Sequence, residues 1–412
     1  MTVTNSHVPD IEQTTPKSLW RNRDFVLLWS GQAISIAGSQ ISLIVFPLLV
    51  LAITRSPVQA GIVGALQSVP FAVLCLPAGA MADRWNRKRM MIVCDAGRTI
   101  ALGSIPLALL FGYLTIAQLY LVGLVEGTLS AFFTAADAAS LPRVVAKEQI
   151  TAALSQSNAA ESTATLIGQA ASGALYTLGR SVPFLADAVS YGVSVLSLSR
   201  IKTQFQEERE SAPRRLWHEI GEGIAWLWRQ PILRFITFLS SVLYTCCGGY
   251  AIILIVLTQK HHASDFVIGL LFATGSLGGI VGALITPLLR DRIRLGHLLI
   301  VSAWIWAITW FVYAIAPNVL WLGMMNVLSF VVVPVYGTLQ YGYRMTIIPD
   351  RLQGRVHSVY RLIVFGSKPI GLALTGALIQ AFGPEWAVVV LALPQIAMCV
   401  AATGWRPLQQ VE

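Results

Sequence analysis

The sequence contains an internal repeat that relates its two halves. Residues 56–61 (SPVQAG) return as residues 264–269 (SDFVIG), and Asp83-Arg84 returns as Asp291-Arg292; both 264 − 56 and 291 − 83 equal 208. The 412 residues therefore form two related halves without a gap in the register. In a membrane, halves of this kind pack around a shared central pathway, which favours moving a solute over transforming it.

Long apolar stretches place both halves in a membrane. Hydrophobic residues make up 55% of the chain and charged residues 12%, whereas soluble domains carry roughly 25% charged residues. A helix needs about 20 mostly apolar residues to cross the hydrocarbon core. We predict an all-α integral membrane protein with twelve transmembrane helices in two pseudo-symmetric six-helix bundles, near residues 26–53, 58–82, 90–112, 116–140, 150–178, 181–200, 232–258, 265–289, 295–315, 318–344, 353–381 and 385–404.

The basic residues predict the orientation of the chain. If the N-terminus is cytoplasmic, 23 of the 29 Lys and Arg residues lie in inner loops and tails, and only Arg55, Arg180 and Lys260 lie in outer loops. The remaining three lie within spans. This bias is what the positive-inside rule requires, so we expect both termini in the cytoplasm.

This topology divides the chain into five parts. They are an N-terminal tail (1–24), an N-terminal six-helix bundle (25–200), a cytoplasmic linker (201–231), a C-terminal six-helix bundle (232–404) and a C-terminal tail (405–412). Apolar residues at helical spacing and three tryptophans predict an amphipathic helix in the second part of the linker. This helix lies in the inner headgroup layer or packs beneath the bundle, and the sequence favours neither.

Charge, cysteines and motifs argue against several other classes of protein. The net charge of +9 follows from the topology and not from a basic face that binds nucleic acid. All five cysteines lie in apolar spans without the spacing of metal ligands. The chain has no GxxxxGK[ST] nucleotide loop and no HExxH or GxSxG motif. We therefore expect no cofactor, no metal and no nucleic-acid partner. The sequence favours a transporter over a membrane enzyme.

The loop between the second and third spans carries the most specific motif. It reads Gly79-Ala-Met-Ala-Asp83-Arg84-Trp-Asn86-Arg87-Lys88-Arg89 and resembles motif A of the major facilitator superfamily. Residues 28–35, 184–190 and 354–358 are similar to the drug and siderophore exporter branch, which includes macrolide efflux proteins and the enterobactin exporter. This similarity covers about residues 19–404 and implies the major facilitator fold, a small-molecule substrate and a bacterial inner membrane.

The resemblance implies a gate at this loop, shut in one state and open in the other. Gly79 would permit close helix contact, and Asp83 could face the positive N-terminal end of a helix in the other half. The basic residues could pair with nearby acids. We expect these residues to take part in gating: Gly79, Asp83, Arg84, Arg87, Lys88, Asp95, Arg98, Asp137 and Arg361. The simpler alternative is that the charges only set the topology. Asn86 stands where motif A has glycine, and asparagine tolerates a left-handed turn there.

Glycines predict where helices approach closely. Residues 168–175 (GQAASGAL) echo residues 371–378 (GLALTGAL), so the repeat continues to the end of each half. Gly278 and Gly282 form a GxxxG pattern, and such small residues let helix backbones touch within a membrane. Gln169 follows Gly168 where drug–proton antiporters have proline, which is a departure from that pattern.

Several ionisable side chains are predicted inside the membrane, where a charge costs roughly 2.5–3.5 kcal/mol or more. Glu126 lies near the midplane, about 15 Å into the fourth span, and could exchange a proton for substrate or only pack helices. Glu161 and Lys368 lie at similar depth and could pair. Gln32 and Tyr244 lie on polar stripes that could line an aromatic cavity or serve as packing faces.

Together these features predict a secondary active transporter that works by alternating access. We expect a monomer that exports amphipathic small molecules of the drug, macrolide or siderophore type, driven by a proton gradient. The predicted substrate and proton-coupling residues are Glu126, Glu161, Lys368, Gln32 and Tyr244. An importer or a lysophospholipid-type flippase of the same fold is the alternative.

Overall fold

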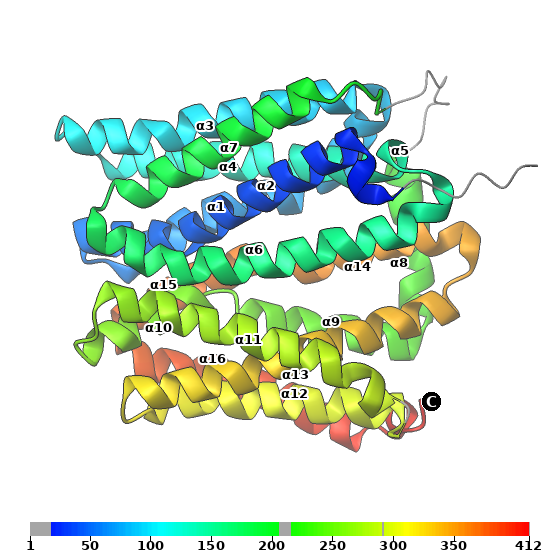
Figure 1. Cartoon of the computed structure of the whole chain (residues 1–412). Coiled ribbons are helices and arrows are strands. Elements are labelled where there is room, and N and C mark those ends of the chain that lie inside the picture. The colour runs from blue at the N-terminus through cyan, green and yellow to red at the C-terminus, as the bar shows by residue number, and fades with distance from the viewer. Residues whose placement is uncertain (1–17, 206–215, 291, 412) are drawn as a thin grey trace, which may run out of the picture.

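The computed structural model describes residues 18–205, 216–290 and 292–411 (Figure 1). Most of the predicted N-terminal tail, the charged part of the linker at 206–215 and Asp291 of the second-half echo therefore lie outside the described residues. Within the described ranges every regular element is a helix.

The first half contains six long helices that run back and forth along the bundle axis (Figure 1). These are α1 (Arg23–Thr54), α2 (Pro57–Arg84), α3 (Arg87–Leu110), α4 (Ile116–Ala138), α6 (Ile150–Leu178) and α7 (Val182–Arg200). Three short elements accompany them: η1 (Leu19–Arg21), α5 (Leu141–Val144) and η2 (Lys147–Gln149).

The second half also crosses the bundle six times, with two of its crossings broken. The crossings are α9 (Pro231–Cys246) with α10 (Tyr250–Lys260), α11 (Asp265–Arg290), α12 (Leu295–Val312) with η3 (Tyr313–Ile315), α13 (Val319–Ile347), η4 (Asp350–Leu352) and α14 (Gln353–Gly366) with α15 (Lys368–Phe382), and α16 (Pro384–Gly404). The linker helix is α8 (Leu216–Arg229), and α17 (Arg406–Gln409) follows the last crossing.

The number of crossings agrees with the prediction. In the described part of the chain, 11 helices or joined helices are long and apolar enough to cross a membrane. The twelfth is α6, which has 29 residues but carries more Ser, Gln, Asn and Glu side chains than the others. The predicted all-α fold with two six-helix bundles is therefore confirmed.

The two halves pack in the same way internally. In the first half α2 packs on α4 and α3 on α7, and in the second half α11 packs on α13 and α12 on α16. The predicted GxxxG contact is present, because a Cβ on Gly278 would lie 2.3 Å from the backbone oxygen of Val327 on α13. The largest buried apolar cluster extends across both halves and includes Leu49 of α1 and Ile255 of α10.

Two of the predicted spans are present but each contains a break in its helix. The seventh crossing breaks at Gly248 and Gly249, and the eleventh breaks just before Pro369, which cannot continue a helical hydrogen-bond ladder. The two breaks contact each other. A Cβ on Gly248 would lie 2.9 Å from the backbone oxygen of Lys368, so glycine is what allows this approach.

The turn between α2 and α3 differs from the expected left-handed turn. Asn86 has φ −65° and ψ 106°, which is extended backbone. Its side chain accepts a hydrogen bond from the backbone N–H of Arg89 at 3.0 Å. Asn86 therefore serves as the N-cap of α3, a role that its side-chain oxygen performs and that a glycine has no side chain to perform.

The bundle has two distinct ends. The end that carries the α2–α3 turn, α5, α8 and the C-terminus is called the basic end here, and the other is called the opposite end (Figure 1). At the basic end α8 packs against α14 and α9. Leu227 is fully buried there and Glu222 pairs with Arg355 of α14. Of the two readings of the linker helix, these contacts favour packing beneath the bundle.

Candidate functional site: a cavity closed at one end between the halves

Two helix pairs make most of the contacts between the halves, α2 with α15 and α6 with α11. Glycines make both contacts close at the opposite end. A Cβ on Gly61 would lie 3.2 Å from the Cα of Gly376, and a Cβ on Gly269 would lie 2.9 Å from the Cα of Gly173. The glycines of the 208-residue repeat, Gly61 and Gly269, thus contact the glycines of the second echo in the other half. The sequence repeat becomes a pair of equivalent contacts that close this end.

A hydrogen bond between the halves supports this closure. Ser276 of α11 donates to the side-chain oxygen of Gln169 on α6 at 2.8 Å. Gln169 is also 3.4 Å from the side-chain oxygen of Gln40 on α1. The residue that departs from the antiporter pattern therefore bridges the two halves, and the sequence did not indicate this role.

Beneath the closed end lies a central cavity of about 240 Å³. Both halves line it, from α1, α2 and α6 on one side and from the break between α9 and α10, α11, α13 and α15 on the other. The aromatic part of its wall is built around Tyr250, whose ring lies 5.5 Å from that of Phe272 and 5.4 Å from that of Phe330. Lys368 lines the same cavity.

A second cavity, of about 630 Å³, lies at the basic end and is called the basic-end cavity. α2 and α4 line one wall, and α8 and α14 line the other. Gly79 and Asp83 face it from α2, and Arg361 faces it from α14. A Cβ on Gly79 would have no neighbour within 4 Å, so the close helix contact expected at Gly79 is not present in this conformation.

The basic residues of motif A bind backbone oxygens within their own half. Arg87 donates to the backbone oxygens of Ala139 at 3.0 Å and Phe205 at 3.3 Å, and its distance to Asp83 is 3.5 Å. Lys88 donates to the backbone oxygen of Ile201 at 2.5 Å. These bonds fasten the start of α3 to the ends of α4 and α7. Arg84 is exposed.

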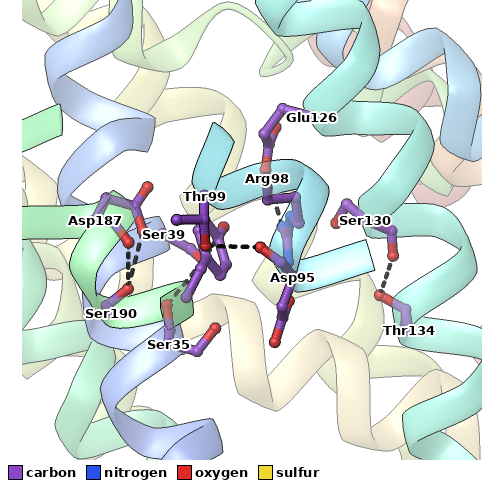
Figure 2. A network of polar contacts seen from close by, with 11 residues as sticks. Ser35, Ser39, Asp95, Arg98, Thr99, Glu126, Ser130, Thr134, Asp187 and Ser190 are labelled. Atoms are coloured by element: carbon purple, nitrogen blue, oxygen red, sulfur yellow. Dashed lines mark hydrogen bonds and ion pairs between the residues drawn. The ribbon is translucent and has the colours of Figure 1, made fainter. Parts of the chain in front are cut away.

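Three of the predicted ionisable residues of α3 and α4, Asp95, Arg98 and Glu126, meet in a buried network (Figure 2). Arg98 donates to Glu126 at 2.9 Å, and its other terminal nitrogen lies 3.5 Å from Asp95. Asp95 is fully buried, and Arg98 and Glu126 are 6% and 8% exposed. The Arg98 guanidinium also lies 4.2 Å from the ring centroid of Tyr191 on α7. Arg98 thus pairs with two carboxylates from two helices, and among the described residues no ion pair joins it to Asp137.

This network touches the central cavity through one side chain. Gln67 lines the cavity and donates to the second carboxylate oxygen of Glu126 at 2.5 Å. Gly127 keeps α4 against α2 at this level, since a Cβ there would lie 2.0 Å from the backbone oxygen of Gln67. Glu126 itself is not among the cavity-lining residues. Glu126 therefore contacts the cavity indirectly, through Gln67.

The remaining predicted site residues are dispersed. Glu161 is exposed on α6, and no ion pair joins it to Lys368 among the described residues. Gln32 is half-buried on α1 and lines neither cavity. The ring of Tyr244 packs 5.1 Å from that of Phe365 in the second half. Of the predicted substrate residues, Lys368 alone lines the central cavity.

The chain matches known transporter families over nearly its whole length. Residues 14–412 match the family described as transmembrane secretion effector. The multidrug efflux pump Tap of Mycobacterium tuberculosis is 28% identical over 411 residues, with 95% of each chain covered. The enterobactin exporter EntS of Citrobacter koseri is 25% identical over 365 residues, covering 86% of this chain and 85% of the relative.

Solved structures share the fold. The nucleoside transporter NupG superposes with a TM-score of 0.78 at 10% identity, covering 94% of this chain and 100% of its own. The overall helical fold of this chain is therefore a known one. Because the family match extends over almost all of the chain, the protein belongs to the transmembrane secretion effector family, in the drug and siderophore exporter branch of the major facilitator superfamily, and is a membrane transporter and not an enzyme.

Proposed function

We propose that this protein exports amphipathic small molecules across a bacterial inner membrane by alternating access, with its basic end in the cytoplasm. The observation that carries the proposal is the asymmetry between its ends. The halves touch through Gly61, Gly173, Gly269 and Gly376 at the opposite end, while the basic end holds a cavity of about 630 Å³. A conformation of this kind accepts a solute from the basic end. The printed names of the relatives, a multidrug efflux pump and an enterobactin exporter, support the outward direction.

The gate at the basic end would close in the other state. Gly79 and Asp83 on α2 lie across the basic-end cavity from Arg361 on α14. When the halves rotate and the glycine contacts part, α2 and α14 approach each other at this end. Gly79 then supplies the room for a close helix contact, and Asp83 comes toward the arginines of α14. Gly79 is the part of motif A whose close helix contact would form only in that other state.

Proton coupling is the second part of the proposal, and it rests on the Arg98 network. A proton on Glu126 would neutralise one of the two carboxylates that Arg98 holds, and it would change the hydrogen bond between Glu126 and Gln67. Because Gln67 lines the central cavity, the protonation state of Glu126 and the occupancy of the cavity influence each other. The single chain encloses this whole path, so a monomer suffices as the transport unit.

The direct test measures transport in proteoliposomes that hold a purified full chain and a fluorescent apolar amine, N-phenyl-1-naphthylamine. An imposed gradient that is acidic on the side of the opposite end is expected to accelerate dye movement toward that side severalfold. Collapse of the gradient by an ionophore is the control. Movement toward the basic end under every gradient would contradict export and favour an importer or a flippase. Equal rates of dye movement with the imposed gradient and after its collapse would contradict proton coupling.

The orientation has its own test, with one cysteine introduced at each end of α3. Trp85 is 58% exposed at the basic end and Tyr113 is 79% exposed at the opposite end. In whole cells, a membrane-impermeant thiol reagent is expected to label Tyr113→Cys and to leave Trp85→Cys unlabelled until the membrane is permeabilised. Labelling of Trp85→Cys in intact cells would place the basic end outside and overturn the proposed direction.

A further inference from the structure

Lys368 stands apart from the other charged groups inside the bundle. It is the first residue of α15, next to the break in the eleventh crossing, and it lines the central cavity. Among the described residues no carboxylate lies within 4 Å of its ammonium group, whereas Arg98 has two carboxylate partners. An ionisable group inside a membrane is costly and usually has a partner, water or a functional role.

The central cavity is otherwise uncharged. Of the described residues that line it, Lys368 is the one charged residue, and the wall contains no acid. Glu126 is turned away from the cavity toward Arg98. The cavity therefore has a net positive charge when Lys368 is protonated, and its apolar walls strengthen the field of that charge.

The basic-end cavity also has a positive balance, because three arginines and one acid, Asp83, line it. Arg351, Arg355 and Arg361 face the basic-end cavity, and Lys368 follows them on the same crossing. Arg355 is paired with Glu222, and Arg361 lies 5.6 Å from the ring centroid of Phe71. The positive-inside rule accounts for arginines at the membrane surface. It does not account for Lys368, which lies roughly 20 Å further along the crossing than Arg355 at about 1.5 Å per residue.

The cavity wall offers a complementary surface for an apolar ring. The Tyr250 ring contacts those of Phe272 and Phe330, and Phe46 also faces the cavity. Flat aromatic groups bind such walls by offset or edge-to-face contact. Gln67 and Gln169 add hydrogen-bonding groups from the first half.

We propose that the central cavity is a site for amphipathic anions. The apolar body of the ligand packs against the aromatic wall around Tyr250, and its carboxylate or sulfonate accepts hydrogen bonds from the Lys368 ammonium group. This proposal rests on the proposed export function and adds the chemical class of the substrate. It also gives Lys368 a counter-ion, which arrives with the ligand.

The test compares two probes that differ by one acidic group. They are 8-anilinonaphthalene-1-sulfonate and its uncharged parent, N-phenyl-1-naphthylamine, and both fluoresce more strongly in apolar surroundings. Affinities are measured for the purified full chain in lipid nanodiscs, with empty nanodiscs as the background. The variants are Lys368→Met, Lys368→Gln and Lys368→Arg. The control is Lys260→Met, which removes an exposed lysine that pairs with Glu385 and does not line the central cavity.

We expect Lys368→Met and Lys368→Gln to weaken binding of the sulfonate by about tenfold or more, the usual effect of losing a hydrogen bond to a charged group. Binding of the parent amine is expected to change less than about twofold. Lys368→Arg retains the positive charge and is expected to restore most of the sulfonate affinity. Lys260→Met should behave as the wild type with both probes.

Three results would overturn the inference. The first is a wild type that does not bind the sulfonate, and the second is an equal loss of affinity for both probes in Lys368→Gln. The third is an unchanged sulfonate affinity in both neutral variants. Failure of the export proposal is a separate result. If the sulfonate binds through Lys368 but neither probe moves across proteoliposomes, the anion site stands and export fails. If the wild type exports the parent amine while the affinity for the sulfonate does not depend on Lys368, export stands and the anion site fails.

Discussion

Substitution of Arg98 by methionine is expected to lower the free energy of unfolding by about 3–5 kcal/mol, the usual cost of removing one partner from a buried ion pair. The change leaves Asp95 and Glu126 as two buried carboxylates without a cation. Methionine occupies much of the space of the arginine stem, so the loss reports charge more than volume. Thermal unfolding of the purified protein in detergent measures it, and transport by this variant is expected to fall to background.

Arg344 provides a matched control in the second half. It is 3% exposed, and its guanidinium lies 3.5 Å from the ring centroid of Tyr360. Among the described residues no carboxylate pairs with it. Substitution of Arg344 by methionine therefore strands no anion, and we expect a loss of no more than about 1–2 kcal/mol from the cation–π contact. Equal losses for Arg98→Met and Arg344→Met would contradict the account of the network given above.

Glu126→Gln separates coupling from stability. The amide can still accept a hydrogen bond from Arg98 and contact Gln67, and Arg98 keeps Asp95 as its counter-ion. In the double variant with Arg98→Met, the combined loss should be smaller than the sum by about 1 kcal/mol or more, because the two groups interact directly. In cells, Glu126→Gln is expected to raise dye accumulation toward the level without transporter while the protein remains folded.

The position of Glu126 shows how far the sequence alone could lead. Its depth near the midplane followed from counting residues along the fourth span, and the repeat and the apolar stretches were sufficient for the two six-helix bundles. Its partner was missed because Arg98 was assigned to the gating residues and Glu126 to the substrate residues. Arg98 lies 11 residues after Arg87, where α3 begins, and Glu126 lies 12 residues before Ala138, where α4 ends at the same end of the bundle. Neighbouring antiparallel helices place such residues at one level.

Other features depend on packing between the halves, which cannot be predicted from a single sequence. Glycine and proline weaken helices by their residue type, but only the fold brings the break at Gly248-Gly249 next to the one before Pro369. Gln169 was noted as a missing proline, and its hydrogen bond to Ser276 requires knowing that α6 meets α11. Gly79 was expected to make a close contact, and whether it does so depends on which end of the transporter is closed.

The two glycine contacts at the opposite end are expected to be required for the conformation that is closed at that end. Substitution of Gly269 by valine is expected to prevent closure, because its Cβ would lie 2.6 Å from the backbone nitrogen of Gly173 and only separation of α6 from α11 relieves the clash. Overpacking of this kind costs about 1–3 kcal/mol in the closed state. That cost shifts the conformational equilibrium roughly 5- to 150-fold toward the state open at the opposite end. Transport is expected to fall by a similar factor.

Two native cysteines report this shift directly. Cys247 lines the central cavity and Cys75 lines the basic-end cavity, so each serves as a single cysteine in a background where the others are replaced. In Gly269→Val, an impermeant thiol reagent applied at the opposite end should label Cys247 faster, and Cys75 should become slower to label from the basic end. Gly279→Val is the matched control on the same helix, since a Cβ on Gly279 has no neighbour within 4 Å.

The repeat extends this prediction to the other half. Gly61 makes the equivalent contact with Gly376, so Gly61→Val should produce the same reversal of labelling as Gly269→Val. A folded Gly269→Val protein with the labelling pattern and transport rate of Gly279→Val would contradict the glycine gate. If Gly269→Val reversed the labelling and Gly61→Val did not, closure would depend on α6 and α11 alone, and the twofold equivalence of the contacts would have no part in the transport cycle.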